Sequence, residues 1–568
     1  MNFFNQLANG LSQRWNAFTQ ELEWSRVHVQ SYQLHKEGKF TEAFLVGEQA
    51  LILAQSLHSG DHADVATSLD FLGLLYYSQA RYSEAEPLYL QALEMTQRLF
   101  TGDSSRVACS LRSLGSLYYS QGRYSEAEPL FLQALEMWQR LFTGDSSTAA
   151  ILLNDLAKLY DSQARYSEAE PLYLQALGMR KRLFTGDHAD VALSLKNLAV
   201  FYDSQGRYSE AEPLYLQALE MFQRLFTGDH ADVALSLNDL AVFYDSQGRY
   251  SEAEPLYLQA LEMWQRLLTG DDPNLATSLK NLAVLYYSQG RYSEAEPLYL
   301  QALGMRKRLF TDDHADVALS LNDLAVFYDS QGRYSEAEPL YLQALEMKQR
   351  LLTGDDPNLA IFLNNLAGFY DSQGRYSEAE PLYLQALEMK QRLFTGDHPD
   401  VAISLNNLGS LYRTQARYSE AEPLCLQALE MFQRLFTGDH PDVASSLNNL
   451  AELYNSQGRY SEAEPLCLQA LEMFQRLFAS DHPDVAKNLD TLAELYNSQG
   501  RYSEAEPLCL QALEMKQRLF AGDHPDVAKN LDTLAELYNS QGRYSEAESL
   551  CLQALEMRQR LFTGRASS

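Results

Sequence analysis

Apolar and polar positions follow one order that recurs along nearly the whole chain. Between residues 399 and 413, apolar side chains recur at spacings of three and four, which is typical of one buried helix face. These positions are Val401, Ala402, Leu405, Leu408 and Tyr412. A short polar break follows, and the same spacing resumes from Ala421 to Leu435. The pattern predicts two amphipathic helices in each copy.

The ends of these helices also carry signals. Pro399 and Asp400 suit the first turn of a helix, which favours proline and acidic residues. Most copies place Ser-Gln-Gly after the first helix, and this predicts a helix stop. Ser419 and Glu422 stand three apart, so we expect a capping box that begins the second helix at Ser419.

The period of the pattern is 42 residues, without insertions or deletions. It is set by the tyrosine of the phrase Arg-Tyr-Ser-Glu-Ala-Glu at Tyr82, Tyr124, Tyr166, Tyr208, Tyr250, Tyr292, Tyr334, Tyr376, Tyr418, Tyr460, Tyr502 and Tyr544. A degenerate copy places Phe40 one period upstream. A fixed period of this size predicts a solenoid in which each copy packs on the next.

The period divides the chain into three parts. We expect an N-terminal amphipathic helix over 1–23, a degenerate first repeat over 24–65, and twelve repeats over 66–568. The twelve repeats start at residues 66, 108, 150, 192, 234, 276, 318, 360, 402, 444, 486 and 528. The predicted fold class is all-α, an α-solenoid of about 13 antiparallel helix pairs.

The copy over 108–149 resembles the tetratricopeptide repeat. The matching positions are Leu114, Gly115, Tyr118, Ala127, Phe131 and Ala134. The 42-residue period is similar to the kinesin-light-chain type of this repeat. The resemblance implies a right-handed superhelix whose first helices line a concave groove. It also implies a scaffold that binds peptide segments of other proteins in that groove.

Composition and the absence of known motifs limit the classes of function that the chain can have. The chain holds 45 Lys and Arg against 76 Asp and Glu, and its formal net charge of -31 opposes binding to nucleic acid or to an anionic membrane. We find no apolar run long enough to cross a bilayer and no secretory signal, so we expect a cytoplasmic protein. No catalytic or cofactor motif is found, so we expect no enzyme and no cofactor.

Two periodic series resemble reactive sites but have structural explanations. One holds His62, His188, His230, His314, His398, His440, His482 and His524. At one histidine per copy they are too far apart to share a metal, and we expect them to cap the first helices. Four copies hold Ser104, Ser146, Asp272 or Asp356 instead. The other series, Cys425, Cys467, Cys509 and Cys551, replaces a second-helix tyrosine and is expected in the core.

The candidate peptide-binding residues lie on the first helices. Just before the recurring leucine stand Asn197, Asn281, Asn365, Asn407 and Asn449. The resemblance implies that an asparagine there holds the backbone of a bound peptide, because an amide both donates and accepts. Three copies hold Asp155, Asp239 or Asp323 instead, and an ionised carboxylate only accepts. The alternative is that the asparagines are only solvated helix residues.

Acidic residues outnumber basic ones on the predicted groove face, with fourteen against seven. Those chosen as candidate binding residues are Asp203, Asp245, Asp329, Asp371, Glu452, Glu494 and Glu536. This balance predicts a neutral or basic partner segment. Lys487 with Asp490, and Lys529 with Asp532, stand three apart and are expected to pair with each other.

The two ends of the array leave alternatives open. Leu7, Leu11, Trp15, Phe18 and Leu22 fall on one helical face, and we expect this helix to cap the first unit. Docking of the same segment into the groove is the alternative. After the last repeat the chain ends in Thr-Gly-Arg-Ala-Ser-Ser, so a second function is self-association through the C-terminal repeat.

Overall fold

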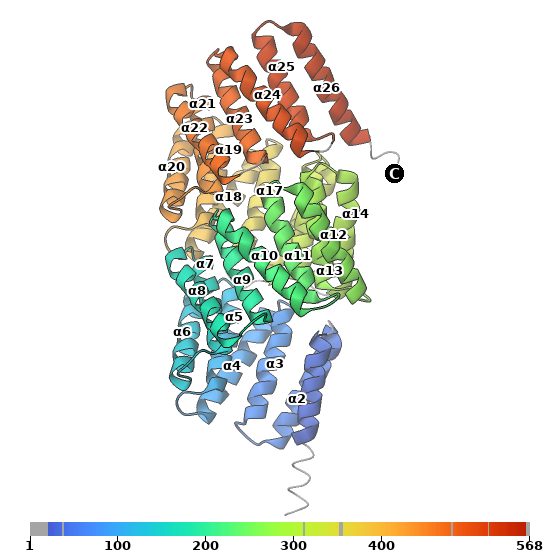
Figure 1. Cartoon of the computed structure of the whole chain (residues 1–568), viewed down its shortest axis with the longest axis vertical. Helices are drawn as coiled ribbons and strands as arrows, with labels where there is room; N and C mark the ends of the chain where they lie inside the picture. Colours follow the sequence, from blue (N-terminus) through green and yellow to red (C-terminus); the bar gives the residue numbers. More distant parts are fainter. Residues whose placement is uncertain are drawn as a thin grey trace, which may run out of the picture. The chain divides into compact units, whose positions relative to one another are not determined.

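The computed structural model describes residues 21–36, 39–310, 313–351, 356–478, 481–520 and 522–563. Within these ranges every regular element is a helix (Figure 1). The chain divides into two compact units, Met1–Thr185 and Gly186–Ser568. The predicted N-terminal helix over 1–23 lies almost wholly outside the described residues, and whether it caps the array stays a prediction.

The first unit contains a helix over 21–36 and seven labelled helices. These are α2 (Phe40–Leu57), α3 (Ala63–Ser78), α4 (Tyr82–Leu99), α5 (Ser105–Ser120), α6 (Tyr124–Leu141), α7 (Ser147–Ser162) and α8 (Tyr166–Leu183). From α4 on, each even-numbered helix packs against the odd-numbered helix before it. We call the odd-numbered member of each pair the first helix and the even-numbered member the second helix.

The second unit continues the same order without a break in period. Its helices are α9 (Ala189–Ser204), α10 (Tyr208–Leu225), α11 (Ala231–Ser246), α12 (Tyr250–Leu267), α13 (Pro273–Ser288), α14 (Tyr292–Leu309), α15 (Ala315–Asp329), α16 (Tyr334–Leu351), α17 (Pro357–Ser372), α18 (Tyr376–Leu393), α19 (Pro399–Thr414), α20 (Tyr418–Leu435), α21 (Pro441–Ser456), α22 (Tyr460–Leu477), α23 (Pro483–Ser498), α24 (Tyr502–Leu519), α25 (Pro525–Ser540) and α26 (Tyr544–Thr563). The prediction of an α-solenoid of thirteen helix pairs is confirmed.

Small residues bring the two helices of a pair together. Ala421 and Ala428 on α20 are fully buried. A Cβ on Gly409 of α19 would lie 2.7 Å from the sulfur of Cys425, so a larger residue there would push the helices apart. The core forms on the side of each helix that the hydrophobic pattern predicts.

The loop histidines cap the first helices, as expected. In each case the side chain of the residue before the helix accepts a hydrogen bond from a backbone N–H in the first turn. For example, Nδ1 of His482 accepts from the N–H of Asp484 at 3.1 Å. Ser104, Ser146, Asp272 and Asp356 cap their helices in the same way. One role therefore explains all of these residue types.

The capping box expected at the second helices is wrong. Helix α20 begins at Tyr418, and its N-cap residue, Arg417, makes no side-chain capping bond. The glutamate joins neighbouring copies instead, since a carboxylate oxygen of Glu422 lies 2.8 Å from Arg459 of the next copy. Arg459 also stacks over Tyr454 at 4.0 Å and pairs with Glu462. The arginine and the glutamates of the Arg-Tyr-Ser-Glu-Ala-Glu motif thus connect each copy to the next.

The cysteine prediction holds for three of the four residues. Cys425, Cys467 and Cys509 are buried, but Cys551 is exposed. Its place on α26 is the same, but within the described residues no later helix packs over α26. Among the described residues all cysteines are free thiols.

The inner side of the curve is formed by the first helices. Neighbouring first helices such as α19 and α21, or α23 and α25, approach one another closely, whereas the second helices stand farther apart. An array bent in this way is concave on its first-helix side. The first helices of the second unit therefore line the groove, as the resemblance implied.

Within the second unit the array turns far enough for later copies to contact earlier ones. Nε2 of His440 lies 3.2 Å from the carbonyl oxygen of Ser204, and His482 repeats this contact with Ser246 at 3.2 Å. Tyr208 stacks on Phe478, with ring centroids 5.8 Å apart. We call this set of contacts the inter-turn seam. It fixes the curvature of the groove in the second unit.

Candidate functional site

The candidate site is the inner face of the first helices in the second unit. Each first helix presents four places across this face, which in α9 are held by Leu193, the pair Lys196 and Asn197, Val200, and Asp203. The same places recur in every copy at the 42-residue period. The chemistry of the groove is therefore read by following each place along the array.

Three of the five predicted asparagines are already engaged or buried. Asn197 is only 8% exposed. The side-chain amide of Asn281 donates to Asn238 at 3.1 Å, and that of Asn365 donates to Asn322 at 3.2 Å. These bonds link one first helix to the next, which the sequence reading missed.

The other two predicted asparagines are open. Asn407 on α19 and Asn449 on α21 are half-buried and make no hydrogen bond with the part of the chain that the structure describes. Each amide therefore offers its donors and its acceptor to a bound backbone. Asn407 and Asn449 remain the best candidates for peptide binding among the five.

The aspartates at the asparagine place pair with a base of the preceding copy. Lys196 lies 3.0 Å from Asp239, and in the first unit Arg112 lies 2.6 Å from Asp155. Lys280 acts on Asp323 electrostatically in the same sense. These pairs and the asparagine bonds form a polar ladder along the floor of the groove.

Among the described residues, three of the carboxylates farther along the helices, Asp203, Asp245 and Asp329, have no such base beside them. Burial raises the pKa of Asp203 and of Asp245 to about 6, opposed only by hydrogen bonds from Tyr215 and Tyr257. Burial also raises the pKa of Asp329 and of Asp371, although Arg413 partly opposes the effect at Asp371. At Asp203, Asp245 and Asp329 the raised pKa reports a carboxylate that is partly desolvated without a neighbouring cation among the described residues.

The predicted glutamates differ from one another in their surroundings. Glu452 is neutralised by Arg413 at 3.2 Å and accepts a hydrogen bond from Asn448 at 3.0 Å. Glu494 and Glu536 are exposed. The three positions line one side of the groove in α21, α23 and α25.

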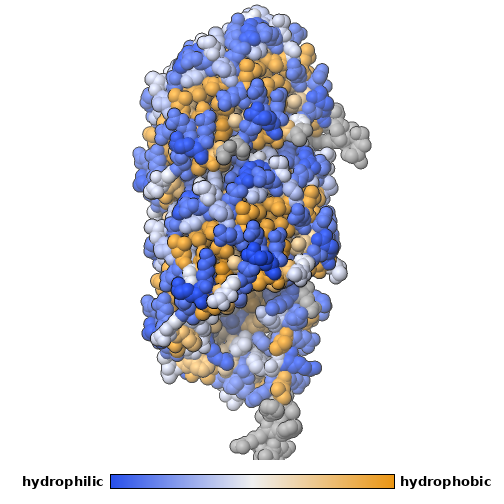
Figure 2. Space-filling model, in the orientation of Figure 1, coloured by the Kyte–Doolittle hydropathy of each residue, from blue (hydrophilic) through white to orange (hydrophobic). Residues whose placement is uncertain are grey.

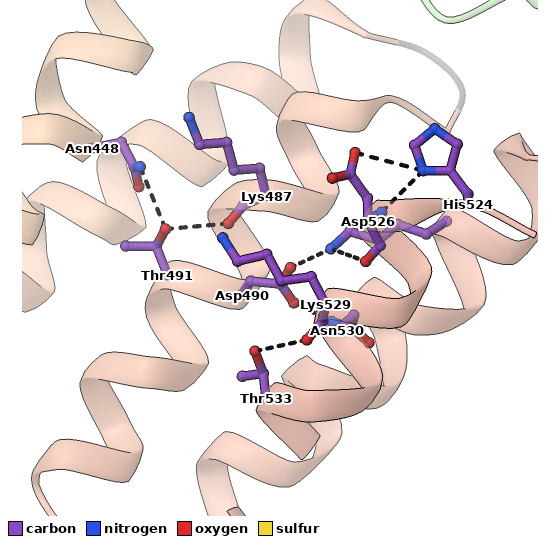
Figure 3. Close-up of polar contacts among 10 residues, drawn as sticks. Asn448, Lys487, Asp490, Thr491, His524, Asp526, Lys529, Asn530 and Thr533 are labelled. Atoms are coloured by element: carbon purple, nitrogen blue, oxygen red, sulfur yellow. Dashed lines mark hydrogen bonds and ion pairs between the residues drawn. The ribbon is translucent and has the colours of Figure 1, made fainter. Parts of the chain in front are cut away.

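The predicted pairing of Lys487 with Asp490, and of Lys529 with Asp532, is wrong. The carboxylate of Asp490, on α23, accepts a hydrogen bond from Asn530 of α25 (Figure 3). It also pairs with Lys516 of α24. Asp532 pairs in the same way with Arg558 of α26. The aspartates face the neighbouring helices, so both lysines remain exposed on the inner face.

Exposed aliphatic residues also line the groove, and the sequence reading did not single them out. Leu193, Leu319, Ile361 and Ile403 hold one place, and Val200 and Val242 another. The sequence signal that could have identified these residues is an apolar side chain on the otherwise polar side of a predicted first helix. Another exposed row, which includes Leu216 and Leu258, runs along the second helices. Apolar side chains accordingly reach the surface as patches among hydrophilic ones (Figure 2).

One group of side chains has ligand atoms close enough to hold a metal ion. The ligand atoms of His58, His62 and Asp64 lie within 4.8 Å of one another. The rings of His58 and His62 stack at 3.3 Å, which copies the stacking of Phe478 on His482 at 3.4 Å. Nδ1 of His62 already caps α3. The arrangement of His58, His62 and Asp64 is therefore explained by the same packing that is found at the start of the first helix in other copies.

The comparisons with known proteins agree with this architecture. The tetratricopeptide repeat family matches in overlapping segments over residues 31–98, 106–182, 168–224, 190–264, 232–308, 292–350, 358–434, 415–475, 442–508 and 488–560. The chain belongs to the tetratricopeptide-repeat proteins. No curated protein matches the sequence. Within the described residues no helix has the length and apolar character needed to cross a membrane.

Several solved structures are similar to this chain. A crystal structure of kinesin-light-chain nearly identical TPR-like repeats from Podosopora anserina is 24% identical and covers 38% of this chain and 100% of its own, with a TM-score of 0.30. A single-substitution variant of the same protein is 25% identical and covers 37% and 98%, with a TM-score of 0.31. A Rap protein in complex with competence and sporulation factor is 16% identical and covers 73% and 99%, with a TM-score of 0.45.

Proposed function

We propose that this tetratricopeptide-repeat protein is a non-catalytic scaffold that binds extended, neutral or basic segments of partner proteins in the groove of its second unit. The observation that supports this most directly is the pair of open amides on neighbouring first helices, Asn407 and Asn449. A repeated amide suits a ligand whose backbone, and not its sequence, is held. Two such amides on neighbouring copies add avidity.

Affinity capture from the source lysate, read by mass spectrometry, tests the proposal. The variant Asn407→Ala/Asn449→Ala removes two backbone contacts of about 1 kcal/mol each, so capture should weaken about thirtyfold. The matched control is Gln427→Ala/Gln469→Ala, which removes exposed amides from the second helices of the same copies. Equal losses in the two variants would contradict groove binding.

A second function, self-association through the C-terminal repeat, is favoured by the surface of α26. Leu552 and Leu555 are 53% and 50% exposed, whereas Leu513, which holds the place of Leu555 one copy earlier, is 9% exposed. Light scattering over a range of concentrations tests this function. A mass that rises with concentration, and that falls to the monomer in Leu552→Gln/Leu555→Gln, would support it. A monomer at every concentration would exclude it.

A further inference from the structure

Aliphatic residues of the groove form two rows on the first helices α9, α11, α13 and α15. The leucine row comprises Leu193, Leu235 and Leu319, and the valine row comprises Val200, Val242, Val284 and Val326. Leu193, Leu319, Val200 and Val242 are exposed, whereas Leu235, Val284 and Val326 are half-buried. Leu193 is 39% exposed and Val200 is 46% exposed, so both side chains are open to a ligand in the groove. The rows are broken only in α13, where Thr277 replaces the leucine.

A third row lies beside the valines. It holds Asp203, Asp245 and Asp329, each three residues after a valine of its own helix. Valine and aspartate therefore neighbour each other on one helix face. The leucine row lies seven residues before the valine row, about 10 Å away along the helix. The polar ladder of Lys196 and Asp239 runs between the two aliphatic rows.

This cross-section suits an extended chain that runs along the array. Side chains of an extended chain point alternately to opposite sides. A backbone above the polar ladder would direct one set toward the leucine row and the other toward the valine row. Neighbouring helices stand about 10 Å apart, a distance that three residues of an extended chain span. Each row is therefore a continuous apolar surface and does not provide a separate pocket for each residue of the ligand.

The valine and aspartate rows together fit a particular kind of side chain. Lys and Arg have apolar stems that pack on aliphatic surface while the charged end reaches a polar group. A stem on Val200 or Val242 would place its charge at Asp203 or Asp245. A plain aliphatic side chain would leave these carboxylates desolvated and unpaired.

The electrostatics of the seam reinforce this preference. Within the part of the chain that the structure describes, no Lys or Arg side chain opposes the burial that raises the pKa of Asp203 and of Asp245 to about 6. Carboxylates of the next superhelical turn add to the field, since Asp203, Asp442 and Asp484 all act to raise the pKa of Tyr208 beyond the effect of its burial. Negative charge thus accumulates beside the valine row.

We propose that the inner face of α9, α11 and α15 binds an extended segment in which aliphatic residues alternate with Lys or Arg. This inference rests on the proposed function and names the chemistry of its ligand. The last copies select differently, because Lys487 and Glu494 hold in α23 the places that Leu193 and Val200 hold in α9. The alternating segment therefore belongs to the earlier part of the second unit.

Calorimetric titration with synthetic peptides tests the alternation. The probe is a peptide of about twelve residues in which Val and Lys alternate, long enough to cross about four copies. Its controls are an isomer with all the Val before all the Lys, and a peptide in which Val and Glu alternate. We expect the alternating Val-Lys peptide to bind at least about tenfold more tightly than its isomer, which has the same charge and composition.

The chain itself supplies matched substitutions. Val200→Ser/Val242→Ser introduces the residue that Ser410 places there in α19, and Asp203→Asn/Asp245→Asn/Asp329→Asn introduces the residue that Asn497 places there in α23. Each should weaken the alternating peptide about tenfold or more. Leu216→Ser/Leu258→Ser, on the second helices, should leave its affinity unchanged.

The outcomes separate the two proposals. Equal binding of the alternating peptide and its isomer would overturn the alternation, as would indifference to the groove variants. If the Val-Glu peptide binds best and loses affinity in Val200→Ser/Val242→Ser, the ligand chemistry is wrong while the groove still functions. If neither the peptides nor the captured partners respond to any groove substitution, both proposals fail.

Discussion

At the scale of single residues, glycine is needed in the turn between helices for two separable reasons. Gly248 has φ +68°, and a Cβ there would lie 3.2 Å from the carbonyl oxygen of Asp481 and 3.2 Å from Pro483. Gly500 has nearly the same φ, +72°, but no atom lies within 4 Å of such a Cβ. Ala416 shows that alanine adopts this backbone conformation, at φ 57°.

Alanine should therefore destabilise one turn more than the other. Gly248→Ala and Gly500→Ala both incur the left-handed strain of about 1 kcal/mol, and only Gly248→Ala adds about 1–3 kcal/mol of crowding at the seam. The difference in thermal unfolding, or in hydrogen exchange around the two turns, measures this. Equal losses would mean that the inter-turn seam is absent in solution.

The carboxylates of the groove make binding depend on pH. With a pKa of about 6 in the free protein, Asp203 and Asp245 are mostly protonated at pH 5 and mostly ionised at pH 7. A bound Lys favours the ionised form, so affinity for the alternating Val-Lys peptide should rise between pH 5 and pH 7. Titrations across this range give the slope.

The asparagine variant is the control for that slope. In Asp203→Asn/Asp245→Asn/Asp329→Asn the rise should become shallower, with a remainder from Asp442, whose pKa burial also raises to about 6. If the affinity of this variant rises with pH as steeply as that of the wild type, the groups that titrate are not these aspartates.

At the scale of helices and loops, one histidine both caps a helix and joins two superhelical turns. Nδ1 of His440 accepts from the N–H of Asp442 at 3.2 Å, and Nε2 faces the carbonyl of Ser204. Both contacts are made at once by the neutral ring with its proton on Nε2. Burial lowers the pKa of His440 to about 4. The ring therefore stays neutral at pH values well below the ordinary pKa of histidine.

Substitution by serine should separate the two roles. Ser104 and Ser146 already cap first helices, so His440→Ser keeps a cap and loses the seam bond. We expect it to lower stability by about 1 kcal/mol more than His230→Ser, which caps α11 with a side chain 37% exposed. Hydrogen exchange at the turn after α9 reports the local loss. Equal effects of the two variants would contradict a seam role.

The same pair of variants should show a pH signature. The stabilisation from His440 is present above about pH 6.5, its unfolded value, and is lost as pH falls toward the folded value of about 4. The advantage of the wild type over His440→Ser should therefore shrink across this window. Asp442 titrates in the opposite sense but is common to both proteins, so its contribution largely cancels in the difference.

The sequence predicts the features that recur within each copy. It does not predict the contacts between copies that lie one superhelical turn apart. The helix pairs, the histidine caps and the buried Cys425 follow from local spacing alone. The seam between His440 and Ser204 joins residues 236 apart, and this offset depends on small rotations summed over many copies. A local signal existed, because proline follows His440, His482 and His524, whereas alanine follows His188 and His230.

Part of the candidate site could be predicted in the same way. The place of Asn407 and Asn449 follows from the pattern, but the bond from Asn281 to Asn238 depends on which residues the neighbouring copy holds. The capping box failed for a similar reason, since Glu422 is used by Arg459 of the next copy. Pairing between copies is visible only when adjacent repeats are placed side by side.

At the scale of the whole molecule, negative charge lies on both faces of the array. The second helices carry exposed glutamates such as Glu220 and Glu262, while the inner face carries the partly buried carboxylates. A net charge of -31 should attract basic segments before contact, and salt should slow their association. The inner carboxylates lie beside the aliphatic rows of the groove, whereas Glu220 and Glu262 each follow an exposed leucine of the second helices, Leu216 or Leu258, by four residues.

The most direct test of groove binding is carbodiimide labelling of carboxylates, read by mass spectrometry, with and without a captured partner. We predict that the partner protects Asp203, Asp245 and Asp329 while the labelling of Glu220 and Glu262, whose side chains are 66% and 67% exposed, stays unchanged. Protection of those outer glutamates with the inner aspartates still labelled would contradict groove binding and place partner binding on the second helices.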